Sequence, residues 1–321
     1  MISIPSIRPV ITRSSMAEKL VFTTTKSSGT WGGSSTATIY SYSPKIIVEW
    51  GGTGWSGGSA TQVYTGTDIG GYYAASISRT CSGVGTKTVT VFPADNSDRK
   101  MGELYGFELK RVSASSNAVT TALDFKGARN LQRIFLTNND TTTTSIDLSG
   151  LKSLTSFTTT LPSITSVNFT GCSALGAIEM DFSGGGILDT ITGLDSTKNT
   201  LTSLVIKNAG ITSLDVSNFS SLRGVNLYGC SSLTSLRAQN VMLYALSPNY
   251  YGNYMYFQDG GAQLEGTGLG ASALNQFFTD LATNTSGESG LIGIFNTPGV
   301  NTCDLTIATN KGYTVIGILP P

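Results

Sequence analysis

The stretch ITSLDVSNFSSLRGVNLYGCSSLTSLRAQN, residues 211–240, decides the fold because it repeats one phrase three times. Each copy reads apolar-x-x-apolar-x-apolar, and the copies start at Ile211, Leu222 and Leu233. Side chains alternate between the two faces of a strand, so each phrase predicts a short strand with one apolar face. The residues predicted to face inward are Ile211, Leu214, Val216, Leu222, Val225, Leu227, Leu233 and Leu236.

The same phrase recurs over much of the chain, with starts at Leu131, Thr143, Leu154, Ile164, Leu175, Leu201, Ile211, Leu222 and Leu233. The step from Leu175 to Leu201 is longer and predicts either an irregular unit or a bulged loop. Two phrases form a unit of about 21 residues, within the range of leucine-rich repeats. We therefore expect a solenoid in which each coil adds one strand to each of two parallel sheets, and stacking closes the core.

On this repeat, residues 120–245 resemble the leucine-rich repeats of bacterial surface proteins of the internalin type and of their phage-encoded relatives. The resemblance implies a binding protein whose partners meet the outward side chains of the strands. The inward residues would then serve the fold alone.

The first third of the chain alternates short β-type runs with glycine-rich turns and predicts a β-sandwich over residues 18–115. Val48, Trp50 and Gly51, followed by the run from Gly85 to Val91, resemble PKD-like modules of the immunoglobulin type. Those modules usually carry acidic residues after the W-G pair, whereas this chain has Gly52 and Thr53, so no metal role carries over. Residues 1–17 contain two prolines and predict an extended arm.

The last part, residues 246–321, predicts a small α/β cap after a solenoid that spans residues 116–245. A helix is predicted where Leu274, Phe277, Phe278 and Leu281 recur at helical spacing, followed by a strand in GLIGIF. The segment from Asn296 to Val315 resembles the terminal element of phage and bacterial repeat proteins, with Asp304 placed to cap a short helix and Gly312 to end it. The predicted fold class is thus mainly β.

Two kinds of residue are candidates for contact with a partner. The first are polar residues that interrupt the outward ladder of the opening stretch. The second are tyrosines that cover the open end of the solenoid, the interpretation we favour, or form an aromatic platform for a sugar or protein. The candidates are Asp215, Arg223, Asn226, Arg237, Tyr250, Tyr251, Tyr254 and Tyr256.

Six Thr-Ser pairs follow the repeat and admit two interpretations. They are small, polar, strand-compatible residues, which we favour, or they form a hydroxyl array that binds ice or a glycan. The pairs start at Thr144, Thr155, Thr165, Thr202, Thr212 and Thr234.

Composition narrows the function classes. The chain has no histidine, which removes hydrolase schemes built on that base, and its 20 basic and 20 acidic residues give no net charge to attract nucleic acid. Four scattered cysteines predict neither a zinc site nor disulfides, and we expect Cys172 and Cys230 to be buried free thiols. We predict no catalytic residue, no metal and no cofactor.

These observations predict a non-enzymatic bacteriophage protein on the virion surface, a capsid-decoration or fibre-like protein. Its partners would be other virion proteins, met through the arm and the sandwich, and a glycan or protein of the host surface. The N-terminus shows no export signal and no run long enough to insert into a membrane. A bacterial cell-surface adhesin is the alternative, and formation of a homo-oligomer stays open.

Overall fold

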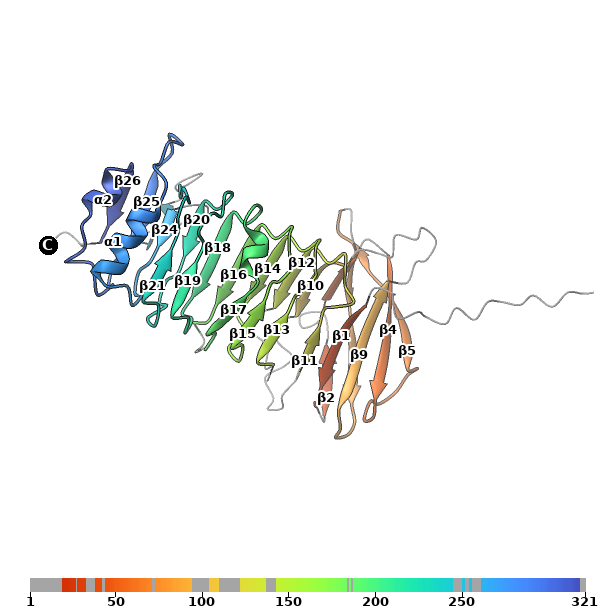
Figure 1. The fold of residues 1–321 in the computed structure, drawn as a ribbon. Helices are drawn as coiled ribbons and strands as arrows, with labels where there is room; N and C mark the ends of the chain where they lie inside the picture. Colours follow the sequence, from red (N-terminus) through yellow and green to blue (C-terminus); the bar gives the residue numbers. More distant parts are fainter. Residues whose placement is uncertain are drawn as a thin grey trace, which may run out of the picture.

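The protein is mainly β and elongated, with about seven turns of a β-solenoid between residues 133 and 316 and few helices (Figure 1). The computed structural model describes residues 19–26, 28–32, 38–41, 44–70, 73–93, 104–109, 122–136, 143–183, 185, 187–244, 250–251, 254–255 and 261–317. Residues 1–18 lie outside this set, so the predicted arm is not tested.

One side of the molecule is a single sheet of 12 strands, here called the long sheet. Its solenoid strands pair in parallel, and their starts at residues 133, 156, 177, 203 and 224 give coils of 23, 21, 26 and 21 residues. In order, the sheet contains β26 (Tyr313–Ile316), β25 (Gly290–Gly293), β24 (Gly261–Gln263), β20 (Gly224–Asn226), β18 (Ser203–Lys207), β16 (Ala177–Asp181), β14 (Ser156–Thr159), β12 (Arg133–Leu136), β10 (Leu104–Leu109), β3 (Thr38–Ser41), β7 (Tyr73–Ser76) and β6 (Thr67–Asp68).

The opposite side of the solenoid, here called the split face, is divided into two smaller parallel sheets. Successive phrases therefore alternate between the two sides, as the repeat predicted. The strands are β13 (Ser145–Asp147), β15 (Ser166–Asn168) and β17 (Thr190–Thr192) in one sheet, and β19 (Ser213–Asp215) and β21 (Ser235–Arg237) in the other.

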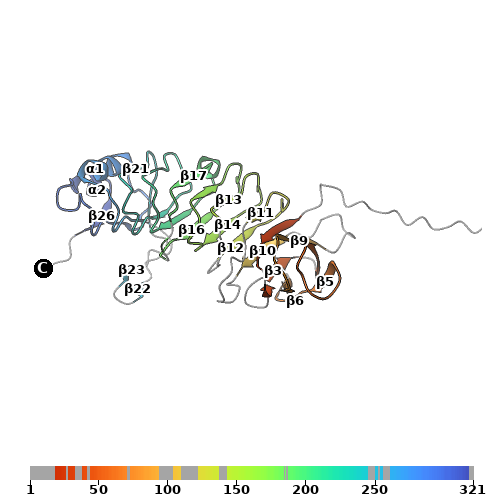
Figure 2. The same ribbon diagram turned by 90° about the horizontal axis from the view of Figure 1, so that it is seen from below.

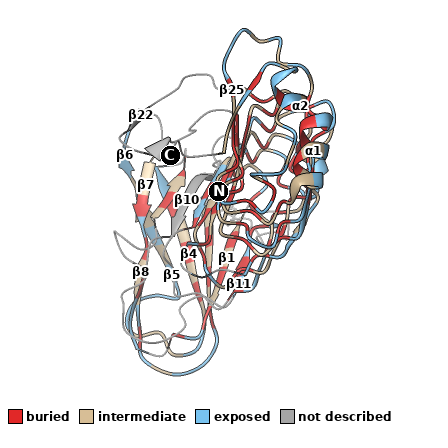
Figure 3. Cartoon of the chain, turned by 90° about the vertical axis from the view of Figure 1, so that its left-hand side faces the viewer, coloured by how far each residue is buried: buried red, intermediate tan, exposed pale blue. Residues whose placement is uncertain are grey.

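The apolar positions of the repeat form the core, which Figure 3 shows along the inside of the solenoid. All eight residues predicted to face inward in the opening stretch are buried, so that prediction is confirmed. Parallel register stacks equivalent residues into rows, and each row hides apolar surface that one coil alone would expose. The central row of the long sheet is Ile134, Phe157, Ile178, Leu204, Val225, Ala262 and Ile292.

The long step between Leu175 and Leu201 holds an irregular unit rather than a bulged loop. It contains its own strand, β17, and a 3₁₀ helix, η1 (Leu194–Thr197). Leu188 and Leu194 are buried, so the unit still adds to the core although it breaks the phrase.

The N-terminal strands continue the sheets of the solenoid. β10 pairs in parallel with β12 on one side and antiparallel with β3 on the other, so the long sheet crosses from the repeat into the first third of the chain. A five-stranded sheet lies opposite, in the order β11 (Ala122–Asp124), β1 (Leu20–Thr24), β9 (Lys87–Pro93), β4 (Lys45–Gly52) and β5 (Thr61–Thr65). A separate two-stranded sheet pairs β2 (Gly29–Gly32) antiparallel with β8 (Ser78–Cys81).

Tryptophans fill the core between these N-terminal strands. The ring of Trp31 lies 5.6 Å from that of Phe22 and 5.9 Å from that of Trp50, and Trp50 lies 5.0 Å from Trp55, with tilted or edge-on packing. Such pairs contribute beyond the area that they bury, by about 0.5–1.5 kcal/mol each.

The C-terminal end carries the two α-helices of the described residues. α1 (Ala271–Asp280) lies beside β21 on the split face and buries Leu274, Phe277 and Phe278, as its spacing predicted (Figure 1). In α2 (Thr306–Thr309), the Asp304 carboxylate accepts the backbone N–H of Thr306 at 2.9 Å, and Leu305 occupies the cap position itself. Gly312 follows with φ +82°, a left-handed conformation that favours glycine.

Candidate interaction surfaces

The four polar candidates of the opening stretch do not form one site. Asp215 and Arg237 are register partners on β19 and β21, on the split face. Asn226 ends β20 and Arg223 immediately precedes it, both on the long sheet. The four residues therefore belong to opposite sides of the solenoid.

Asp215 and Asn226 each form a turn at the end of a strand. The Asp215 carboxylate accepts the backbone N–H of Ser217 at 2.8 Å, and the Asn226 side-chain oxygen accepts that of Tyr228 at 3.0 Å. Five other strand ends do the same, through Asp68, Asp124, Asp147, Asn168 and Asp181. The shared position explains these residues through the fold, since Asn and Asp side chains stabilise such turns.

A sequence signal for these turns exists but lies outside the strand phrase. The signal has four positions: Asp or Asn first, any residue second, often Ser or Thr third, and Gly or Asn fourth. Examples are DLSG, NFTG, DVSN and NLYG. The fourth residue has a positive φ, which glycine and asparagine tolerate best. Those residues are Gly150 (φ +81°), Gly171 (φ +80°), Asn218 (φ +64°) and Gly229 (φ +72°).

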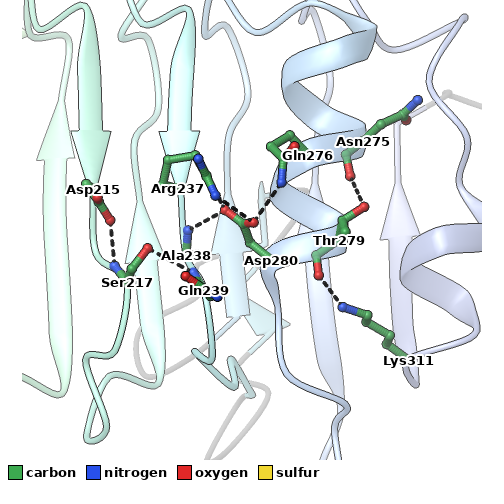
Figure 4. A network of polar contacts seen from close by, with 10 residues as sticks. All are labelled: Asp215, Ser217, Arg237, Ala238, Gln239, Asn275, Gln276, Thr279, Asp280 and Lys311. Atoms are coloured by element: carbon green, nitrogen blue, oxygen red, sulfur yellow. Dashed lines mark hydrogen bonds and ion pairs between the residues drawn. The ribbon is translucent and has the colours of Figure 1, made fainter.

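Arg237 joins the solenoid to helix α1 through Asp280, and Figure 4 shows this network. Its guanidinium donates to the two Asp280 carboxylate oxygens from Nε at 2.5 Å and from Nη2 at 3.1 Å. The carboxylate also accepts the Gln276 amide and the backbone N–H of Ala238. Burial raises the pKa of Asp280, but the bonds from Arg237, Gln276 and Ala238 outweigh it and hold the pKa below its usual value.

Lys311 also takes part in this junction. The four residues Arg237, Gln276, Asp280 and Lys311 are here called the cap latch. The Lys311 ammonium donates to the carbonyls of Thr279 and Leu281, at the C-terminal end of α1. A cation there favours the helix because the last carbonyls lack partners within it.

Arg223 lies at the base of the tyrosine segment. Its guanidinium sits 5.2 Å from the ring of Tyr244, a cation–π distance, and donates to the carbonyls of Ser220 and Leu222. The backbone carbonyl of Arg223 accepts both the N–H of Tyr244 at 3.1 Å and the N–H of Gly261 at 2.9 Å.

Equivalent carbonyls in other coils also accept two N–H groups. The carbonyls of Gln132, Thr155, Gly176 and Thr202 each accept two N–H groups, and in every case the donors are consecutive residues of the next coil. Tyr244 and Gly261 occupy those two consecutive positions although 16 residues separate them. Residues 245–260 are therefore an insertion into a regular coil.

The tyrosine candidates belong to this insertion. Tyr250 and Tyr251 form β22 (Tyr250–Tyr251), which pairs antiparallel with β23 (Tyr254–Met255), while Tyr256 lies outside the described residues. Figure 2 shows β22 and β23 on the long-sheet side of the solenoid, away from α1. The two strands β22 and β23 thus lie outside the stacked coils.

The Thr-Ser pairs have a role in the stacking of coils. The hydroxyls of Thr155, Thr165 and Thr202 donate to the carbonyls of Gln132, Thr144 and Gly176 at 2.9–3.0 Å. Each acceptor lies in the preceding coil on the same side, so the hydroxyl adds a bond between coils. The description as strand-compatible filler is therefore incomplete.

The outer surface of the long sheet offers a mixed row of side chains beside the insertion. Register aligns Phe135, Thr158, Glu179, Val205, Asn226 and Gln263 across neighbouring strands. Phe135 is 40% exposed and Tyr228, two residues after Asn226, is 41% exposed. The Asn226 amide donates to the Gln263 side-chain oxygen at 2.6 Å, so this part of the row is already linked.

Cys172 and Cys230 are buried free thiols, as predicted. Their sulfurs donate to the carbonyls of Leu148 and Ile206, in the preceding coil of the same side. Burial raises the pKa of each thiol to about 11, so both are protonated at neutral pH.

A buried lysine bonds to the loops that follow β1 and precede β9. The ammonium of Lys87 is fully buried and donates to the carbonyls of Lys26, Gly83 and Gly85 at 2.7–3.2 Å. It thus satisfies carbonyls that would otherwise need another donor or a cation.

Within the described residues, no group of three or more Cys, Asp or Glu side chains could hold a metal ion, and no helix is long and apolar enough to cross a membrane. Comparison of the chain with protein-family models, with curated proteins and with solved structures finds no match.

Proposed function

We propose that this chain is a non-enzymatic bacteriophage protein of the virion surface, a capsid-decoration or fibre-like protein. The coils are leucine-rich repeats, and the N-terminal strands form a PKD-like sandwich of the immunoglobulin type. Residues 1–17 and the sandwich bind neighbouring virion proteins, while the repeat projects outward.

The observation that carries the proposal is the aromatic hairpin inserted into a coil of an elongated, stacked body. Stacked coils hold their shape because each coil bonds to its neighbours, whereas β22 and β23 lie outside the stack (Figure 2). Such a body displays a contact segment at a fixed distance from its point of attachment.

Weak contacts suffice when many copies lie on one particle, because linked binding events add through effective concentration. The zero formal net charge supports this arrangement, since neighbouring copies would not repel one another. Many copies can then pack on a common surface.

The test is a mass-spectrometric inventory of purified phage particles from cultures that produce the protein, with the copy number measured. We expect the chain in the particles at many copies, and a variant without residues 1–17 to lose occupancy. Absence from the particles overturns the proposal, and full occupancy of the truncated variant overturns the role of the arm.

A cell-surface adhesin is a second candidate that the same hairpin supports, because clustered tyrosines provide large contact area with a polar group. Labelled protein would then bind bacterial cells directly, and deletion of residues 245–260 would remove that binding. Cell binding by a protein that purified particles lack would favour this candidate over the virion.

A further inference from the structure

Among the described residues, strand β5 lies at the end of the five-stranded sheet and pairs with β4 alone, so its outer edge carries no strand there (Figure 1). Its five residues, TQVYT, include no charge and no proline, the usual features that keep edges from pairing with other chains. The short edge strand of the long sheet, β6, has only two residues and carries Asp68.

The register of β5 decides which groups point outward. The N–H of Trp50 donates to the carbonyl of Ala60, and that of Gly66 to Pro44, so even-numbered residues of this segment bond to β4. The main-chain groups of odd-numbered residues then point away from β4. Those of Val63 and Thr65 have no hydrogen-bond partner in the part of the chain that the structure describes. Val63 is 61% exposed.

Residues 2–11, ISIPSIRPVI, have the sequence of a strand that can form a hydrogen-bond ladder along one edge only. Both prolines, Pro5 and Pro9, stand at odd positions, and proline lacks the N–H that a ladder needs. The main-chain N–H and C=O groups of alternate residues point to opposite sides of a strand. The edge formed by even-numbered residues such as Ile4, Ser6 and Val10 therefore keeps all of its N–H donors. Such a segment can add to a sheet edge and then blocks any further strand.

We propose that residues 2–11 of one copy of this chain add to β5 of a second copy as an antiparallel sixth strand. Even-numbered residues of the added strand bond to Val63 and Thr65, and the prolines face outward. Each copy both donates and accepts a strand, so copies join head to tail in a ring or an open row. This self-association does not depend on the proposed function at the virion surface.

Chain direction favours a second copy over the same chain. β1 runs parallel to β4, so a strand antiparallel to β5 would run parallel to β1. Parallel strands of one sheet need a crossover of about a dozen residues or more. Only residues 12–19 would remain to cross three intervening strands, β5, β4 and β9.

The first experiment measures molar mass by sedimentation velocity over a concentration series of the full chain. We expect multiples of the 33.6 kDa chain, a monomer after removal of residues 1–17, and at least tenfold weaker association for Val63→Lys. Ile187→Lys, equally exposed at 61% but on the solenoid, is the matched control and should associate like the wild type.

The second experiment tests whether prolines are tolerated only at odd-numbered positions of the added strand, and it does not rely on variants of the folded body. A peptide of residues 1–13 should bind the chain that lacks residues 1–17 with one peptide per chain. Ser3→Pro adds a proline at an odd position and should be tolerated, whereas Ser6→Pro removes an inward N–H and should weaken binding at least tenfold.

A full-length monomer at every concentration overturns the proposal, including one whose arm binds in cis. Equal binding of the two proline peptides overturns the assigned pairing. Self-association of a protein that is absent from virions would contradict the proposed function and leave this inference standing.

Discussion

The two ends of the solenoid are closed by different means. At the N-terminal end the long sheet continues through β10 into antiparallel strands, and hydrogen-bond ladders close the stack. At the C-terminal end the split face stops at β21, where α1 covers it and Arg237 and Asp280 fasten it. The N-terminal closure thus consists of main-chain hydrogen bonds, whereas the C-terminal closure consists of the packed apolar face of α1 and the ionisable side chains of the cap latch.

Among the substitutions, the largest effect is expected from Phe277→Ala, which empties a buried site between α1 and the last coils. Large aromatic residues lost from a core cost about 3–5 kcal/mol in the free energy of unfolding. Hydrogen exchange should rise in α1 and β21 while β1 and β9 keep their protection. Phe22→Ala, also fully buried, should show the opposite pattern; equal exchange in the two variants would contradict separate closures.

Loss of the latch carboxylate is expected to cost less. Asp280→Ala removes the acceptor for Arg237, Gln276 and Ala238 and should lower the free energy of unfolding by about 2 kcal/mol. Asp215→Ala, an exposed carboxylate with a local bond to Ser217, is the control and should cost about 0.5 kcal/mol. Chemical denaturation measures both, and equal losses would refute a special role for the latch.

Acid should weaken the same end of the molecule. The pKa of Asp280 lies below its unfolded value of about 3.9, so its contribution is complete above that pH and falls as pH drops through the folded pKa. Thermal melting from pH 7 to pH 3 should therefore lose stability mainly below about pH 4. Asp280→Asn should flatten this part of the curve; an unchanged curve would exclude Asp280 as its source.

The smallest effect is expected from deletion of residues 245–260 with Tyr244 joined to Gly261. Their N–H groups already occupy neighbouring positions on the Arg223 carbonyl, so the free energy of unfolding should change by about 1 kcal/mol or less. A deletion of equal length, residues 184–199, removes buried Leu188 and Leu194 and should prevent stable folding. Similar damage from both deletions would show that the hairpin supports the coils.

The repeat predicted the side-chain pattern of the solenoid because burial follows directly from apolar spacing. Leu214, Val225 and Leu236 face inward on alternating sides, and Phe277 and Phe278 lie on the buried face of a helix, all as predicted. Strand β17 was missed since its unit replaces the phrase with a different set of buried residues.

The candidate contact residues were harder to predict because their roles depend on partners distant in sequence. Arg237 meets Asp280, which is 43 residues away, and no local pattern announces that pair. Asp215 and Asn226 looked distinctive against the phrase, yet they repeat the turn role of Asp147 and Asn168. The insertion became visible only when Tyr244 and Gly261 were found on one carbonyl.

The direction of the ladders gives the solenoid a mechanical property. Strands lie across the long axis, so the hydrogen bonds between coils run along it, and tension between the two ends pulls coils apart in succession (Figure 1). A released coil of 21 residues lengthens the chain by about 65 Å, at roughly 3.3 Å per residue less one strand spacing. Because each coil contacts only its neighbours, we expect the remaining stack to stay folded while the chain extends.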